Sequence, residues 1–147
     1  MSEHEPNLIK ELLPHRSPFL FVDDIVSADS SKIIARHVFT EKEFFFAGHF
    51  PQYPVVPGVI LVETMAQSGG AGLRKLGILG DDVLFFLATV DKAKFRCQVR
   101  PGDEVRSEIE NLRVSTHMIK QSGKAYVGDK LAAEAEWMCL VGENSDN

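Results

Sequence analysis

Strand signals dominate the chain outside one central segment, and over residues 92–99 and 105–110 apolar and polar residues alternate with a period of two, which is the pattern of half-buried β-strands. Residues 19–28 and 32–39 give the first two predicted strands, and Asp29-Ser30-Ser31 between them favours a turn. Residues 83–90 are apolar and suit a strand that is buried on both faces. The amino-terminal part is different, because Asn7 can cap a short helix over residues 8–13.

The second half of the chain continues as strands. Strict alternation runs on to residue 99, and Pro101-Gly102-Asp103 predicts a turn after it. Alternation returns over residues 105–110. Ser122-Gly123 is predicted to join two further strands as a hairpin, and the last strand is expected to end near Val141.

One central segment, residues 57–76, lacks this alternation and is rich in good helix formers. Pro57 fits the first helical position, Arg74 and Lys75 favour the negative end of a helix, and Gly77 fits the residue after it. The predicted helix is apolar nearly all round, so we expect it to be buried on most sides. Three glycines within it permit close approach of another backbone: Gly69, Gly70 and Gly72.

These elements predict an α+β fold in which a curved antiparallel sheet wraps around one long central helix. A doubly wound sheet is excluded because the crossover helices that parallel strands need are missing. Nothing rich in Pro, Gly or Ser divides the chain, so residues 1–147 are expected to form a single domain, with residues 142–147 as a polar tail.

Composition narrows the class of protein. The chain of 147 residues is 44% hydrophobic and 25% charged, which is typical of a globular domain with a core. Its net charge of −5 argues against nucleic acid as the main partner. An acidic amino terminus without a signal peptide, and no apolar run long enough to span a membrane, predict a cytoplasmic protein. Cys97 and Cys139 form no CxxC pair and are expected to be reduced thiols.

The candidate chemistry lies in residues 44–73, which carry one formally charged side chain, Glu63, and one imidazole, His49. An unpaired buried carboxylate is costly, so Glu63 is at a subunit surface, paired, or kept for a task. His49 lies on a loop stiffened by Pro51, Pro54 and Pro57, which suits a positioned catalytic group. Taken singly, each of the two residues is more often solvated or simply packed.

Two more residues of this segment are candidates for binding substrate. Gly58 has a free N–H at the start of the predicted helix and no side chain to block a carbonyl oxygen, although Pro-Gly also simply starts helices. Gln67 lies one turn after Glu63 on the same face, where it can orient the carboxyl group or merely be tolerated at an interface. The four other histidines show no spacing typical of a metal site.

The order of several motifs resembles the β-hydroxyacyl-acyl-carrier-protein dehydratases of the hot-dog fold. Residues 48–70, GHFPQYPVVPGVILVETMAQSGG, resemble their H-F-P-x-x-P-x-x-P-G-V signature with an acid on the following helix. Residues 13–20 resemble their LPHRxPFL, residues 94–103 their KFRxxVxPGD, and residues 132–135 part of their final strand. The resemblance covers most of the chain, and several ordered motifs are far more specific than one.

The resemblance implies a role for each matched residue. His49 corresponds to the general base that removes the C2 proton of a (3R)-hydroxyacyl thioester, and Glu63 to the acid that assists departure of the hydroxyl as water. The Gly58 N–H corresponds to the donor to the thioester carbonyl. The family forms dimers in which His49 of one subunit would face Glu63 of the other, and these often assemble into hexamers as trimers of dimers. Neither a metal nor a redox cofactor is implied.

The implied partner is acyl carrier protein, which would bring the substrate as a 3-hydroxyacyl phosphopantetheine thioester. Because that partner is acidic, we expect a local basic docking surface at Lys94, Arg96 and Arg100. The alternative is that these residues form an ordinary solvated strand face. Phenylalanines at 44–46 and 85–86 are candidates to line an acyl tunnel or to belong to the core. His15 is assigned a structural role.

Three alternatives remain open from the sequence. An isomerising hydroxydecanoyl dehydratase resembles this chain but typically carries Asp at the position of Glu63. A hot-dog acyl thioesterase also uses a helix amino terminus and a carboxylate, but lacks this proline-rich loop. A non-catalytic acyl-binding module would not need both His49 and Glu63. The sequence does not reveal the acyl chain length, or whether the product enters membrane lipid, lipid A or a secondary metabolite.

Overall fold

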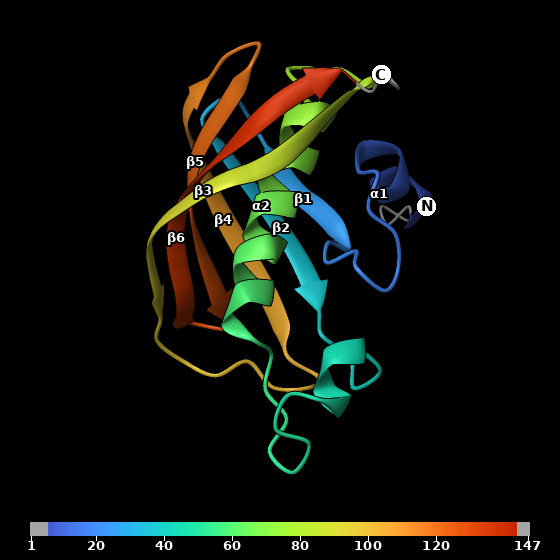
Figure 1. The fold of residues 1–147 in the computed structure, drawn as a ribbon, viewed down its shortest axis with the longest axis vertical. Helices are drawn as coiled ribbons and strands as arrows, with labels where there is room; N and C mark the ends of the chain where they lie inside the picture. The colour runs from blue at the N-terminus through green and yellow to red at the C-terminus, as the bar shows by residue number, and fades with distance from the viewer. Residues whose placement is uncertain (1–5, 144–147) are drawn as a thin grey trace.

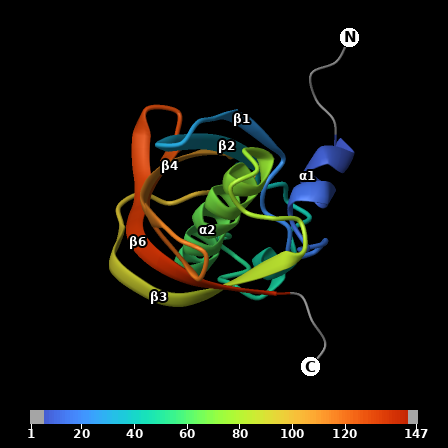
Figure 2. The same ribbon diagram turned by 90° about the horizontal axis from the view of Figure 1, so that it is seen from above.

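A computed structural model describes residues 6–143, in which six antiparallel strands form one sheet that curls around a long helix (Figures 1 and 2). The strand order is β1-β2-β4-β5-β6-β3. The elements in chain order are α1 (Pro6–Leu12), β1 (Asp24–Ala28), β2 (Lys32–Val38), η1 (Phe44–Ala47), α2 (Gly58–Lys75), β3 (Val83–Phe95), β4 (Glu104–Val114), β5 (Met118–Val127) and β6 (Lys130–Glu143). The predicted α+β class is confirmed, and the arrangement is the hot-dog fold.

The helix α2 is buried by the concave face of the sheet, as its apolar sequence predicts. It begins at Gly58, while Pro57 precedes it in an extended conformation and is not the first helical residue. Gly77 has a φ of 78° just after the helix, as expected for the residue that ends one. A Cβ atom added at Gly69 or Gly70 would overlap Gln121 or Phe85, so these glycines let strands approach the helix closely.

Strand β3 differs from its prediction. It runs on to Phe95 through two bulges, and it pairs only with β6 because it lies at the edge of the sheet. The prediction that this strand is buried on both faces is therefore wrong for the single chain. Phe86 is 60% exposed, Leu87 41% and Val90 41%. An edge strand with exposed apolar side chains is typical of a surface that another chain covers.

Other predicted boundaries also shift. Strand β1 begins only at Asp24, and residues 19–23 approach it as irregular chain. Ser122-Gly123 lies in the middle of β5 and is not a hairpin turn, because the turns fall at residues 115–117 and 128–129. Alternation beyond Phe95 does not continue as strand.

Two predictions for the ends of the chain are also wrong. Asn7 lies within α1 and does not precede it as a cap. Gly142 and Glu143, assigned to the polar tail, belong to β6, while residues 144–147 lie outside the described range. Between residues 6 and 143, no helix is long and apolar enough to cross a membrane.

Candidate active site

His49 lies on the loop between the short helix η1 and α2, which Figure 1 shows at the end of the molecule where α2 begins. Its backbone N–H donates to the Phe45 carbonyl over 2.9 Å, and its ring Nδ1 lies 3.0 Å from the Val55 carbonyl oxygen. A carbonyl oxygen only accepts, so Nδ1 carries the proton in this contact. In the neutral imidazole, Nε2 is then unprotonated and available as a base.

The loop around His49 is held by Arg100. Its Nε donates to the Pro54 carbonyl over 2.9 Å, and its guanidinium lies 4.3 Å from the centre of the Tyr53 ring. The Tyr53 hydroxyl donates to Gln98 over 3.0 Å. These contacts connect the proline-rich loop to the segment after β3 and stiffen it at the point that carries the imidazole.

Gly58, the first residue of α2, shares a pocket with His49. Its N–H has no acceptor four residues earlier, and within residues 6–143 no other acceptor contacts it. A Cβ at this position would come within 2.9 Å of the Phe95 ring, so glycine keeps the approach open. The pocket measures about 300 Å³, and its lining residues are His49, Val55, Val56, Gly58, Leu61, Phe95, Arg96, Cys97 and Gln98.

Glu63 lies further along α2, with its side chain 22% exposed. Burial raises the pKa of its carboxyl group, and the hydrogen bond from Gln67 opposes this only in part. The carboxyl is therefore held closer to its neutral, proton-donating form than an exposed glutamate would be. This is the state that a general acid needs.

Gln67 is almost fully buried and uses both ends of its amide. Its Nε2 donates to Glu63 over 3.0 Å and to the Phe19 carbonyl over 3.0 Å, while its Oε1 accepts from the Phe21 N–H at 2.8 Å. Of the two interpretations left open by the sequence, the structure favours orientation of the carboxyl group. The amide also fastens residues 19–21 to α2.

Glu63 lines a different pocket from His49. This second pocket measures about 280 Å³, and its lining residues are His15, Glu63, Ala66, Gln67, Phe85, Phe86, Leu87 and Cys139. The two pockets share no lining residue. Within the single chain, the imidazole and the carboxyl group expected to act together therefore face separate spaces.

His15 contacts this site although the sequence assigned it a structural role. Its Nε2 lies 3.6 Å from Glu63 Oε2, and its buried Nδ1 has no hydrogen-bond partner among the described residues. Burial lowers the pKa of His15, and Arg16 and Arg74 lower it further, so the imidazole is neutral near pH 7. No local sequence pattern predicts the contact between His15 and Glu63, because the two residues are far apart in the chain.

Cys139 also lines the Glu63 pocket but is not a nucleophile. Burial raises the pKa of its thiol to about 12, and the Glu63 charge adds to this. The thiolate is therefore scarce at neutral pH. In the described part of the chain, no three His, Cys, Asp or Glu side chains are grouped to hold a metal ion.

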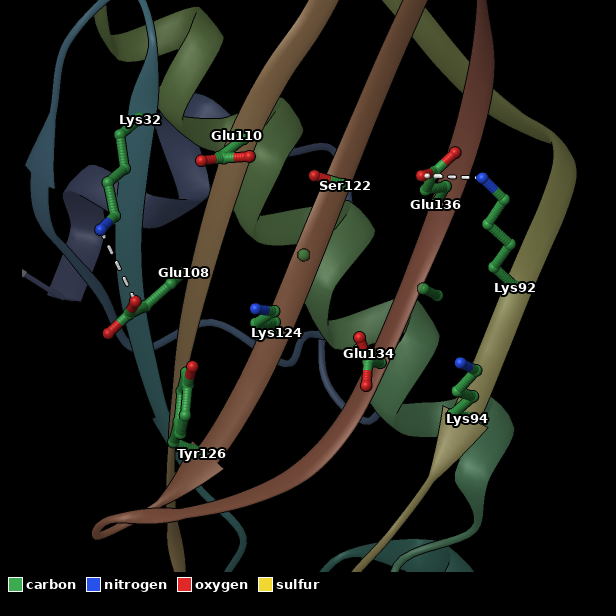
Figure 3. Close-up of a pocket in the computed structure, with 12 residues that line it drawn as sticks. Lys32, Lys92, Lys94, Glu108, Glu110, Ser122, Lys124, Tyr126, Glu134 and Glu136 are labelled. Atoms are coloured by element: carbon green, nitrogen blue, oxygen red, sulfur yellow. Dashed lines mark ion pairs between the residues drawn. The ribbon is translucent and has the colours of Figure 1, made fainter.

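The three predicted docking residues differ in their surroundings. Arg96 pairs with Glu134 at 2.6 Å, and Arg100 braces the His49 loop. Lys94 lines a groove of about 410 Å³ on the face of the sheet away from α2, where Figure 3 shows lysines and glutamates side by side on adjacent strands. With four lysines and four glutamates, this groove has no basic excess that would attract an acidic protein.

Comparison with known sequences gives extensive matches. Residues 13–136 match the model of the FabA-like domain family. A protein of Desulforamulus reducens named 3-hydroxyacyl-(acyl-carrier-protein) dehydratase FabZ is 44% identical over 138 residues, covering 93% of this chain and 96% of the relative. One of the same name from Pelotomaculum thermopropionicum is 46% identical over 136 residues, covering 92% and 96%.

Solved structures share the fold at low sequence identity. The dehydratase heterocomplex ApeI:P from Xenorhabdus doucetiae matches with a TM-score of 0.77 at 14% identity, covering 94% of this chain and 91% of the other. A putative thioesterase from Ralstonia eutropha matches with a TM-score of 0.61 at 18% identity, covering 80% and 83%. At such identities these likenesses support the fold and do not distinguish dehydratase from thioesterase.

Proposed function

Because the chain belongs to the FabA-like domain family, and its extensively matching relatives are named 3-hydroxyacyl-acyl-carrier-protein dehydratases, we propose that it dehydrates a (3R)-hydroxyacyl thioester carried by acyl carrier protein. The products are the trans-2-enoyl thioester and water, and the pathway served is fatty acid biosynthesis. The enzyme is a hydro-lyase of the dehydratase type. The roles of individual residues below are part of the proposal.

The elimination uses one base, one acid and one hydrogen-bond donor. His49 Nε2 takes the proton from C2, and the electron pair of that C–H bond forms the C2–C3 double bond. Glu63 gives its proton to the 3-hydroxyl, which leaves with the electrons of the C3–O bond as water. The Gly58 N–H donates to the thioester oxygen, where negative charge develops as C2 loses its proton.

Strand β3 supports a site shared between two copies of the chain. Its first part, with Phe85, Phe86 and Leu87, lines the Glu63 pocket, and its last residue, Phe95, lines the His49 pocket. If two β3 edges pair antiparallel about a twofold axis, the start of one strand lies beside the end of the other. The Glu63 pocket of one protomer would then meet the His49 pocket of its partner. The single observation that carries the proposal is that the two ends of the edge strand β3 line the two pockets.

The same pairing explains the apolar edge. Phe86, Leu87, Val90 and Phe95 are 41–60% exposed in the single chain and would be covered in the dimer. Covering them also removes the unpaired backbone groups of the edge strand. Assembly of three such dimers into a hexamer remains an expectation from the family.

Docking of the carrier protein remains a prediction for Lys94, Arg96 and Arg100. Neutralising Arg96 is expected to weaken use of the carrier-bound substrate while a short thioester mimic is still turned over. Arg100 is less suited to this test, because its substitution also loosens the His49 loop. A cytoplasmic location is likewise a prediction, which cell fractionation would test.

Product analysis tests the proposed function directly. The purified protein is incubated with 3-hydroxybutyryl and longer acyl carrier proteins, and the products are separated by mass and double-bond position. Trans-2-enoyl product supports the proposal. Cis-3-enoyl product would indicate the isomerising dehydratase, free acid a thioesterase, and binding without turnover an acyl-binding module. A series of chain lengths in the same assay defines the preferred substrate.

A further inference from the structure

A buried histidine, His37 on β2, lies between two carboxylates outside both pockets. Its Nδ1 is 2.9 Å from Asp23 Oδ1, and its Nε2 is 2.9 Å from Glu43 Oε2. The residue is 6% exposed, and the rings of Phe21 and Phe39 meet the imidazole edge-on at 5.9 Å and 4.6 Å between centroids. Water therefore has little access to the imidazole, while the Asp23 side chain is 32% exposed.

The geometry indicates a charged imidazole if both carboxyl groups are ionised. Ionised carboxylates only accept hydrogen bonds, and a neutral imidazole has a single N–H to donate. Two carboxylate contacts at hydrogen-bond distance therefore indicate the imidazolium. Burial alone would lower the pKa of His37, but the hydrogen bonds and charges of Asp23 and Glu43 outweigh it and raise that pKa above its ordinary value of 6.5.

The two carboxylates are not equally dependent on His37. Asp23 also accepts the Val38 N–H at 2.8 Å and lies 3.8 Å from Arg36, which in turn pairs with Asp24 and Glu104. Glu43 has its side chain 13% exposed. Among residues 6–143, His37 supplies the only hydrogen bond to the Glu43 carboxylate. If His37 lost its charge, Asp23 would keep its contacts with Val38 and Arg36, whereas the largely buried Glu43 carboxylate would lose its hydrogen-bonded cation.

Glu43 connects this cluster to the proposed base. It is the residue immediately before η1, which contains the buried Phe45 and Phe46. The Phe45 carbonyl accepts the backbone N–H of His49 at 2.9 Å and that of Gly48 at 3.2 Å. The position of Glu43 therefore fixes the start of the short helix whose end holds the His49 backbone.

We propose that the His37 imidazolium is a positioning residue: its hydrogen bond holds Glu43 and thereby the His49 loop in place, like a latch, and deprotonation of His37 as the pH rises releases this latch. The inference rests on the proposed function only in taking His49 as the base. Because the pKa of His37 is raised in the folded protein, the latch is complete below pH 6.5 and is lost as the pH rises through the folded value.

Two substitutions and a matched control test the latch. His37→Gln removes the charge, and Glu43→Gln keeps the side-chain size but removes one of the two carboxylates, Asp23 and Glu43, that raise the His37 pKa. His117→Gln changes an exposed histidine on the β4–β5 turn and is the control. Imidazole NMR signals are followed against pH, together with kcat and KM for dehydration.

We expect the wild-type His49 signal to show a step, as the pH rises, that coincides with titration of His37. This step is absent in His37→Gln, moves to lower pH in Glu43→Gln, and is unchanged in His117→Gln. His37→Gln lowers kcat by about 10- to 100-fold with little change in KM, because the base is misplaced while substrate binding persists. Any alkaline decline that Glu63 causes is common to all three variants, so their comparison isolates His37.

The outcomes separate the latch from the proposed function. A wild-type protein without dehydratase activity contradicts the proposed function, while the NMR steps still decide whether His37 controls the His49 environment. If His37→Gln keeps the wild-type kcat and the wild-type His49 titration, the latch is wrong. If that variant does not fold, a His49 step that stays at its wild-type pH in Glu43→Gln overturns the inference equally.

Discussion

The Glu63 carboxyl group keeps its proton more readily than an exposed glutamate because burial disfavours its charged form. The Gln67 N–H limits this effect, since a donated hydrogen bond favours the carboxylate. Gln67 therefore has two effects that can be measured separately: it sets the acidity of Glu63, and it ties residues 19–21 to α2.

Gln67→Ala is expected to raise the pKa of Glu63 further, because the opposing hydrogen bond is lost. It should also reduce the free energy of unfolding by about 1–3 kcal/mol, since the buried Phe21 N–H loses its acceptor. Carboxyl ¹³C NMR titration and urea unfolding measure the two effects. Ser68→Ala is the control, because among residues 6–143 this buried hydroxyl hydrogen-bonds only to the Thr64 carbonyl of its own helix. A Glu63 pKa that falls in Gln67→Ala would contradict this account.

Some site residues can be predicted from the sequence, but their contacts with distant residues cannot. Glu63 and His49 stand out because the surrounding segment has no other charge or imidazole, so composition alone marks them. The contact of His15 with Glu63 could not be predicted, because it depends on how the chain before β1 folds back over α2. The sequence did not reveal the His37 cluster for the same reason: His37 on β2 meets Asp23, before β1, and Glu43, before η1, only when the chain folds.

At the scale of elements, the long apolar helix and most strands follow directly from periodicity. The errors concern position within the sheet. Ser122-Gly123 is typical of a turn, yet Gly123 is buried in the middle of β5. An added Cβ would lie 2.5 Å from the Trp137 ring and 2.8 Å from Ile109. The glycine is there to admit a tryptophan from the next strand, which a local pattern cannot reveal.

Gly123→Ala is therefore expected to lower the free energy of unfolding by about 1–3 kcal/mol, because the buried Trp137 ring must move to admit a methyl group. Gly142→Ala on β6 is the matched control, since an added Cβ there meets nothing within 4 Å. Urea unfolding compares the two variants. Equal midpoints would show that the space beside Gly123 relaxes without cost.

The edge strand β3 gives a second prediction at this scale. Val90 lies near the middle of β3 and is 41% exposed, and Val26 on the opposite edge strand β1 is 58% exposed. Val90→Lys should place two like charges near the proposed twofold axis, giving a monomer with activity reduced at least about 100-fold. Val26→Lys should remain a dimer with near wild-type activity.

Light scattering after size-exclusion chromatography measures the assembly state, and circular dichroism checks that both valine variants are folded. A folded Val90→Lys protein that is still a fully active dimer would exclude β3 as the interface.

At the scale of the whole molecule, the motif order predicts both the fold and the family, which the structure and the comparisons confirm. The geometry of the site is less accessible from sequence. The mistaken burial of β3 has a physical cause: its apolar sequence reflects a surface suited to a second chain as much as to its own core. His49 and Glu63 lie in separate pockets of the single chain because, in the proposed dimer, the second chain brings them together.

In the proposed dimer, each active site takes His49 from one protomer and Glu63 from its partner. This arrangement is tested by mixing His49→Ala and Glu63→Gln proteins, each expected to be inactive, under conditions in which subunits exchange. Random mixing makes half of the dimers heterodimers, each with one intact site, so activity should recover to about a quarter of the wild-type value. Mixtures that remain inactive, although heterodimers are shown by mass spectrometry to form, would place both residues in sites within one chain and contradict the account.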